Sequence, residues 1–256
     1  MEYRSLHIDE IRDLESRILF EDNHLLVFNK RSGEIVQADK TQDECLLETL
    51  KAFIAQRDNK PGKVYLGLPH RLDRPVSGVC IFAKTSKALE RLNAMFRDEH
   101  SIQKTYLALC QGKPREKEAL LENWLYRNEK QNKSYIVSEE KAKQLQKKAK
   151  LARLKYKLLG STEKYFLIAV RLLSGRHHQI RCQLSHIGCT IKGDLKYGAA
   201  RSNPDGGICL HAYKVEFVHP VKKEKLSITA PVIAAWEGIV RNLIADFSCT
   251  DWDTFA

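Results

Sequence analysis

The chain has 256 residues, a formal net charge of +11 and an isoelectric point near 9.3, so it can bury a substantial core and favours an acidic partner. No apolar run is long enough for a bilayer span, and the N-terminus lacks the apolar core of a signal peptide. These features exclude a membrane protein, place the protein in the cytoplasm and put nucleic acid first among partners.

The seven cysteines are an odd number and include no Cys-x-x-Cys pair. This spacing indicates neither a disulfide framework nor a zinc ribbon. Most of the cysteines are expected to be small buried hydrophobic residues.

The first residues carry Leu6, Ile11 and Leu14 at roughly helical spacing, and they are too few to form a domain. The sequence therefore predicts a short N-terminal arm over residues 1–17, followed by one domain over residues 18–256.

Two short strands are predicted at 18–20 and 25–28, around a polar turn. Thr41-Gln-Asp-Glu44 has the pattern of a capping box, which predicts a helix. Its apolar face would consist of Leu46, Leu47, Leu50, Phe53 and Ile54.

A polar loop follows. Pro69 and Pro75 disfavour regular helix, and Gly78 permits the backbone angles of a tight turn. We therefore expect a rigid loop from His70 to Ser77, and a buried strand at 79–83 because these residues are apolar and rich in strand formers.

Asp73 lies at the centre of this loop, between Arg71 and Arg74. Nearby positive charge favours the ionised carboxylate, which would be poised as a nucleophile or base. The alternative is that Asp73 caps a turn and pairs with its neighbours at the surface.

Thr85 or Ser86 can cap a helix that ends near Glu99, with Leu89, Leu92, Met95 and Phe96 on one side. Residues 104–110 alternate as a strand in which Lys104, Tyr106, Ala108 and Cys110 share one face. From this pattern alone, Tyr106 could simply be an aromatic residue of the core.

Residues 141–157 form a basic run without an acidic residue: Lys141, Lys143, Lys147, Lys148, Lys150, Arg153, Lys155 and Lys157. Such a run is either a footprint for phosphate or a solvated surface. The alternation of its second half predicts a strand with a basic outer face.

Residues 166–173 predict a strand that leads into Gly175-Arg176, and residues 178–186 predict a short helix closed by Gly188. On this helix His178, Arg181 and Ser185 would share a face. A strand at 211–220 and a helix from Pro231 complete the chain. The order of elements indicates an α+β fold with a mixed, largely antiparallel sheet and flanking helices.

Three blocks of the sequence resemble the RluA-type pseudouridine synthases. His70-Arg-Leu-Asp-Arg-Pro-Val-Ser-Gly78 is similar to that family's His-Arg-Leu-Asp signature. Gly175-Arg-His-His-Gln-Ile-Arg181 resembles its Gly-Arg-x-His-Gln-Ile-Arg block, and Gly193-Asp-Leu-Lys-Tyr-Gly198 its Gly-Asp-x-x-Tyr-Gly block. The resemblance covers roughly residues 18–247, and there is no room for the N-terminal S4-type module that many members carry.

The resemblance implies the pseudouridine synthase fold and a cofactor-free isomerisation of uridine in ribosomal or transfer RNA. Asp73 would be the catalytic aspartate, Arg181 the cation that pairs with it, and Tyr106 the ring that stacks on the uracil. Arg71 would fill the space of a flipped-out nucleotide. Further RNA contacts are expected from His70, Arg74, Arg176, Lys147, Lys148 and Lys150.

Other constellations predict less. His177, His178 and His186 lack a carboxylate or cysteine that would complete a ligand spacing, so no metal is expected. His70 is expected to be a hydrogen-bonding loop residue rather than a base. Asp194 and its flanking glycines are expected to shape a turn. A monomer is expected.

Two alternatives stay open. A basic RNA-binding or ribosome-assembly factor would keep the fold without the chemistry, but it would need none of Asp73, Tyr106 and Arg181. A glycoside hydrolase would need a second acidic residue opposite the first, and no motif supplies one.

Overall fold

The computed structural model describes residues 3–38, 43–232 and 236. Over these residues the chain is an α+β protein with a largely antiparallel sheet, which confirms the predicted fold class. The residues divide into two compact units. Unit 1 comprises the described part of Met1–Lys104, Asp205–Gly207 and Ala212–Ala230; unit 2 comprises Thr105–Pro204, Ile208–His211 and the described residues from Pro231 onward.

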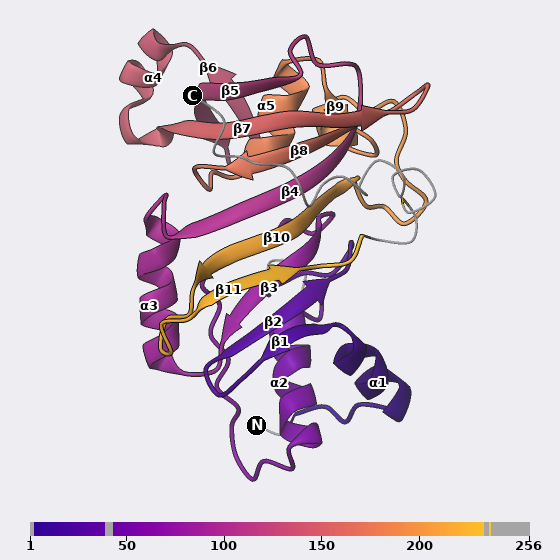
Figure 1. The fold of residues 1–256 in the computed structure, drawn as a ribbon, viewed down its shortest axis with the longest axis vertical. Coiled ribbons are helices and arrows are strands. Elements are labelled where there is room, and N and C mark those ends of the chain that lie inside the picture. Colours follow the sequence, from indigo (N-terminus) through magenta and orange to yellow (C-terminus); the bar gives the residue numbers. More distant parts are fainter. Residues whose placement is uncertain (1–2, 39–42, 233–235, 237–256) are drawn as a thin grey trace. The chain divides into compact units, whose positions relative to one another are not determined.

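The strands of unit 1 follow the order β1-β2-β3-β10, and β11 pairs with β10 (Figure 1). The pairs β1–β2, β2–β3 and β10–β11 are antiparallel. These elements confirm the strands predicted in this part of the chain. Their bounds are Ile18–Glu21 for β1, Leu25–Lys30 for β2, Ser77–Ala83 for β3, Leu210–Val218 for β10 and Lys225–Thr229 for β11.

Strand β3 begins two residues earlier than predicted, so Gly78 lies inside the strand instead of in the preceding turn. Its φ is +109°, and a Cβ placed there would lie 2.2 Å from the carbonyl oxygen of Ala212. Both the backbone conformation and the close approach of β10 therefore require glycine.

Unit 1 also holds α1 (Ile8–Ser16), α2 (Leu46–Arg57) and α3 (Ser86–Arg97). Thr85 caps α3 as predicted, since its side chain accepts a hydrogen bond from the Ala88 N–H. The capping box predicted for α2 is corrected, because the helix begins after Cys45. Thr41 lies outside the described residues, and the Glu44 carboxylate instead accepts hydrogen bonds from Arg4 and Thr49.

The core of unit 1 forms where β2, β3, β10 and β11 meet α3. Buried apolar side chains from each of these elements contact one another there: Leu25, Val27, Val79, Ile81, Ala88, Leu92, Val215, Phe217 and Ile228. The predicted apolar face of α2 is also buried, at Leu46, Leu50, Phe53 and Ile54.

The strands of unit 2 follow the order β4-β8-β7-β5-β6, with β9 paired to β4. Their bounds are Ile102–Gln111 for β4, Glu118–Asn128 for β5, Lys133–Val137 for β6, Ala149–Ser161 for β7, Phe166–Leu172 for β8 and Thr190–Ile191 for β9; β4 begins in unit 1. Helix α4 spans Glu139–Leu145 and α5 spans Gln179–His186, and short 3₁₀ turns occupy Gln146–Lys148 and Leu195–Tyr197.

The strands predicted around 104–110 and 166–173 and the helix predicted at 178–186 are confirmed as β4, β8 and α5. Strand β7 confirms the alternating half of the basic run, because Ala152, Leu154 and Tyr156 are buried between its basic residues. The first half of that run is helix α4, which was not predicted and which Ser138 caps. The helix predicted from Pro231 lies almost wholly outside the described residues.

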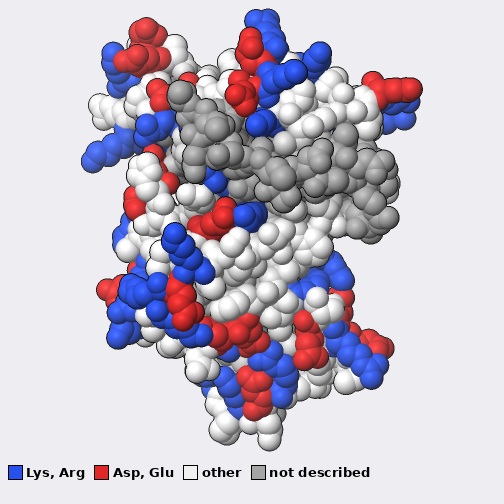
Figure 2. Space-filling view, in the orientation of Figure 1, with Lys and Arg blue, Asp and Glu red and all other residues white. Residues whose placement is uncertain are grey.

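Charges of both signs are mixed over the face shown in Figure 2, where acidic side chains accompany the lysines and arginines of unit 1. Unit 1 also contains ion pairs between such charges, for example Arg57 with Glu21 and Arg31 with Asp13. Within the described ranges, no helix is long and apolar enough to cross a bilayer.

Candidate active site

The backbone around Asp73 forms a turn in which each carbonyl oxygen from Asp73 to Val76 accepts a hydrogen bond. The Asp73 carbonyl accepts one from the Val76 N–H at 3.0 Å. The Arg74 carbonyl accepts from the Gly33 N–H at 2.9 Å, and the Pro75 carbonyl from the Ser32 hydroxyl at 3.2 Å. The loop that follows β2 therefore fixes the turn that carries Asp73.

Lys30 makes the deepest of these contacts. Its side chain is 1% exposed, and its ammonium donates to the carbonyls of Arg31, Arg74 and Val76 at 2.9, 3.0 and 2.7 Å. Burial lowers the pKa of Lys30 to about 8, because the charged form is poorly solvated there. Lys30 lies in the polar stretch Asn29-Lys-Arg-Ser-Gly33, and the sequence predicted no role for it.

His70 fixes the other end of the loop. Its Nε2 accepts a hydrogen bond from the Ile81 N–H at 2.9 Å, and its ring stacks on Phe96 with centroids 4.5 Å apart. Burial, with the charge of Lys104, lowers its pKa to about 3, so the ring is neutral and can accept this bond. The expected hydrogen-bonding role of His70 is confirmed, and its RNA contact stays a prediction.

The three charged residues of the turn differ in their surroundings. Asp73 is partly buried and Arg71 is exposed. Arg74 is exposed as well, and its guanidinium donates to the Asp43 carboxylate at 2.9 Å and to the Gly33 carbonyl at 3.1 Å. Arg74 thus holds neighbouring loops of unit 1 together.

In unit 2, Arg181 on α5 forms a buried ion pair with Asp194. Its Nε and Nη2 donate to the two carboxylate oxygens at 2.7 and 2.8 Å, and the two side chains are 6% and 1% exposed. The Asp194 N–H donates to the carbonyl of Ile191 at the end of β9. Asp194 therefore does more than shape the predicted turn, because it also orients the guanidinium of Arg181.

Tyr197 extends this arrangement along one face of α5. The Arg181 guanidinium lies 5.1 Å from the ring centroid, His178 Nδ1 lies 3.1 Å from the hydroxyl, and the Ser185 hydroxyl donates to the Tyr197 carbonyl. The predicted common face of His178, Arg181 and Ser185 is confirmed, and Tyr197 covers it. Burial, followed by the charge of Arg181, lowers the pKa of His178 to about 2.

Tyr106 lies in β4 and is 9% exposed. The same strand pairs with β9 through Cys110 and Ile191, three residues before Asp194. Asp73 belongs to unit 1, whereas Tyr106 and Arg181 belong to unit 2. Within unit 2, the strand that carries Tyr106 is therefore paired to the short strand β9 that precedes Asp194, the partner of Arg181.

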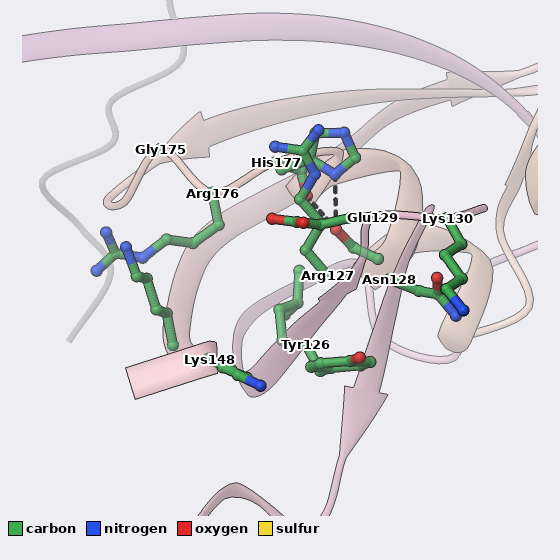
Figure 3. A pocket seen from close by; sticks show the side chains of 12 residues that line it. Tyr126, Arg127, Asn128, Glu129, Lys130, Lys148, Gly175, Arg176 and His177 are labelled. Carbon is green, nitrogen blue, oxygen red and sulfur yellow. Dashed lines mark hydrogen bonds between the residues drawn. The ribbon is translucent and has the colours of Figure 1, made fainter. Parts of the chain in front are cut away.

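Three of the predicted RNA-binding residues line a pocket of about 610 Å³ in unit 2, namely Lys148, Lys150 and Arg176 (Figure 3). Lys147 is exposed beside them. Arg127 and Lys130 from the β5–β6 hairpin line the same pocket. These two residues were not among the predicted RNA contacts, because the sequence predicted no hairpin there.

The histidines considered as metal ligands have other contacts. The rings of His177 and His178 stack with centroids 3.8 Å apart, and His177 Nδ1 lies 2.9 Å from the Ser134 hydroxyl. Among the residues the structure describes, no group of three or more His, Cys, Asp or Glu is placed to hold a metal ion.

Replacing Lys30 by Met should lower the free energy of unfolding by about 2–4 kcal/mol, because buried carbonyls lose their donor. Trypsin should then cut after Arg71, a site that the fixed loop protects in the native chain. Lys51→Met, at an i,i+3 pair in which Lys51 is partly exposed and Glu48 exposed, should change stability by less than about 0.5 kcal/mol. Equal urea midpoints and equal cutting for both variants would contradict this role.

Replacing Asp194 by Asn should lower the free energy of unfolding by about 3 kcal/mol or more, because the Arg181 charge stays buried without its counter-ion. Glu139→Gln, which breaks the exposed pair with Lys143, should cost less than about 1 kcal/mol. Urea unfolding measures both, and a loss below 1 kcal/mol for Asp194→Asn would show that the buried pair is not needed.

Residues 24–186 match the family described as RNA pseudouridylate synthase. The ribosomal large subunit pseudouridine synthase C of Vibrio parahaemolyticus is 31% identical over 245 residues, which cover 93% of this chain and 73% of the relative. The protein of the same name from Buchnera aphidicola is 32% identical over 89% of this chain and 70% of the relative.

Solved structures show the same fold. Human RNA Pseudouridylate Synthase Domain Containing 4 aligns with a TM-score of 0.74 and 21% identity, covering 91% of this chain and 95% of that one. Human RNA Pseudouridylate Synthase Domain Containing 1 aligns with a TM-score of 0.63 and 21% identity, over 89% and 94%. Both the sequence matches and the fold agree with the resemblance found in the three sequence blocks, and the chain belongs to the RNA pseudouridylate synthase family.

Proposed function

We propose that this chain converts specific uridines of ribosomal RNA to pseudouridine, with Asp73 as the catalytic carboxylate and with no cofactor. The fixed turn around Asp73, in a member of this family, is the observation that carries the proposal. Large-subunit ribosomal RNA comes first because the relatives at about 31% identity are named for that subunit. Transfer RNA is the second candidate.

The reaction is an isomerisation. The bond between N1 of uracil and C1′ of the sugar breaks, the uracil turns over, and C5 forms a bond to the same C1′. The hydrogen on C5 leaves as a proton and N1 gains one, so no atom or electron is supplied from outside. The protein needs an ionised carboxylate at the sugar and base, a cation beside it, and a platform for the ring.

We assign these roles to Asp73, Arg181 and Tyr106. The bidentate contact with Asp194 supports Arg181, because it fixes the plane and the direction of a buried guanidinium. The low exposure of Tyr106 supports a ring held in one position in β4. Lys30 and His70 act as positioning residues for the turn that carries Asp73.

A uridine within folded RNA must leave its stack to reach a carboxylate, which costs a few kcal/mol. Arg71 is the proposed residue that fills the vacated space. It is exposed on the same fixed turn as Asp73, and its planar guanidinium can stack on bases while contacting phosphate.

The alternative, a basic RNA-binding or ribosome-assembly factor without chemistry, would not require a fixed carboxylate or a buried guanidinium. We propose further that the protein works as a monomer in the cytoplasm, where ribosomal RNA is found. RNA is the proposed partner, with Arg74, Arg176, His70 and the lysines of the basic run among its contacts.

Asp73→Asn should abolish pseudouridine formation while leaving the urea midpoint and the RNA affinity nearly unchanged, because the amide keeps the shape and loses the negative charge. Pseudouridine mapping on total RNA from cells with the gene, without it, or carrying the variant would identify the target site. A site that survives the substitution would refute the assignment of Asp73. If cells without the gene keep every pseudouridine that cells with the gene contain, the proposed function is refuted.

Arg71→Ala should slow modification most where the target lies in stacked structure, because unstacking costs most there. The measurement is single-turnover pseudouridine formation on a structured and an unstructured RNA that share the target sequence. Asp73→Asn is the control, since it should be inactive on both. Equal fractional losses for Arg71→Ala on the two RNAs would show that Arg71 supports the loop and does not aid flipping.

A further inference from the structure

The pocket of unit 2 forms where two paired strands separate. Strands β5 and β7 pair from Glu118 and Lys157 to Tyr126 and Ala149. Beyond that point β5 continues along β6, whereas the chain before Ala149 turns into the 3₁₀ segment that contains Lys148. The pocket occupies this divergence, with the Gly175–His177 loop as a further wall (Figure 3).

The lining of this pocket is strongly basic. Arg127, Lys130, Lys148, Lys150 and Arg176 contribute five cations, and Glu129 contributes the carboxylate among the lining residues. These cations come from three separated stretches of the sequence, so the fold gathers them. In Figure 3 the labelled side chains of Arg127, Lys130, Lys148 and Arg176 lie around one space, with Arg176 and Lys130 on opposite sides.

Two of the cations are held in defined positions. Arg176 Nε donates to the carbonyl of Leu151 at 3.0 Å, and Arg127 Nη2 donates to Asn132 Oδ1 at 3.1 Å. His177 Nε2 lies 3.1 Å from the same oxygen. These contacts fix the directions of both guanidinium groups at the wall of the pocket.

We propose that this pocket is a second RNA subsite, which holds the phosphodiester backbone of one or two nucleotides away from the base that is modified. The guanidinium groups match phosphate geometry, and about 610 Å³ falls within the range of roughly 300–1,000 Å³ typical of ligand sites. Tyr126 supplies an aromatic ring in the lining, on which a base can stack. The choice of RNA as the polymer rests on the proposed function.

The position of the pocket on the Gly175–Arg181 block gives the subsite a purpose. Arg176 and His177 line it, and the helix that follows carries Arg181 to its ion pair with Asp194. Within unit 2, RNA held in the pocket is therefore placed relative to Arg181 through one short, largely buried segment.

The test compares two double variants of the same basic run. Lys148→Ala with Lys150→Ala removes two pocket cations, whereas Lys141→Ala with Lys143→Ala removes the same charge from α4, outside the described lining. Binding of ribosomal RNA fragments is measured against salt concentration without turnover. The pocket variant should bind roughly 10-fold or more weakly at 0.1 M salt, with the logarithmic salt slope reduced by about 1.5.

The control variant should keep most of its affinity and slope, because Lys143 pairs with Glu139 and its side chain is 75% exposed. Glu129→Gln should change affinity in the opposite direction, with binding about 2- to 5-fold tighter, because it removes the negative charge that faces the phosphate. Equal weakening in the two double variants would overturn the proposal, because it would show a diffuse electrostatic surface. Unchanged binding in the pocket variant would overturn it too.

Two further measurements separate the possible explanations. Polyglutamate that competes as well as an RNA of equal charge would overturn the choice of RNA. Single-turnover modification at subsaturating RNA should slow in the pocket variant by about the same factor as its loss of affinity, because the subsite acts through binding. If the native chain binds RNA through the pocket but forms no pseudouridine, the proposed function fails and the subsite stands.

Discussion

The buried ammonium of Lys30 is the contact on which the candidate active site depends most. It donates to the Arg74 and Val76 carbonyls of the turn that carries Asp73, and Ser32 and Gly33 donate two further hydrogen bonds to carbonyls of the same turn. A polar turn this rich in backbone groups would otherwise be free to exchange its hydrogen bonds with water. Burying the Lys30 ammonium costs free energy, and its lowered pKa reflects that cost. In return, its three N–H donors fix the backbone carbonyls of the turn, which an apolar side chain cannot do.

A second buried charge has a corresponding role in unit 2. The pair of Arg181 and Asp194 contributes little net stability over a hydrophobic pair, because desolvation offsets much of the attraction. Its effect is on direction, since two parallel hydrogen bonds fix the plane of the guanidinium, and Tyr197 covers one side of it. In unit 1 a buried cation, Lys30, fixes the turn that carries Asp73, and in unit 2 the buried cation Arg181 is itself fixed by Asp194. Such preorganisation is what the proposed cofactor-free isomerisation requires.

The catalytic roles of Asp73, Tyr106 and Arg181 stay predictions. The sequence predicted the fold class and most elements, because hydrophobic periodicity and short motifs are local signals. It failed where a residue's role depends on distant partners. Nothing near Lys30 shows that its ammonium reaches the carbonyl of Val76, and Asp194 looks like a turn residue until α5 brings Arg181 against it. The capping box near Thr41 failed because the Glu44 carboxylate is engaged by Arg4 and Thr49. Of the cations that line the basic pocket, the sequence predicted Lys148, Lys150 and Arg176 as RNA contacts. Arg127 and Lys130 were not predicted, because they come from an unpredicted hairpin.

The central claim is that the chain rearranges uridine within RNA by means of its own side chains. The most direct measurement incubates the purified native chain, with a chelator present, with ribosomal RNA that carries tritium at C5 of uridine. Because C5 becomes the glycosidic carbon, the account predicts that tritium passes into water in proportion to the pseudouridine formed, while the RNA stays intact and no free uracil appears. Free uracil without tritium release would indicate glycoside hydrolysis, and binding with no release from any ribosomal or transfer RNA would indicate a non-catalytic factor; either result would contradict the account.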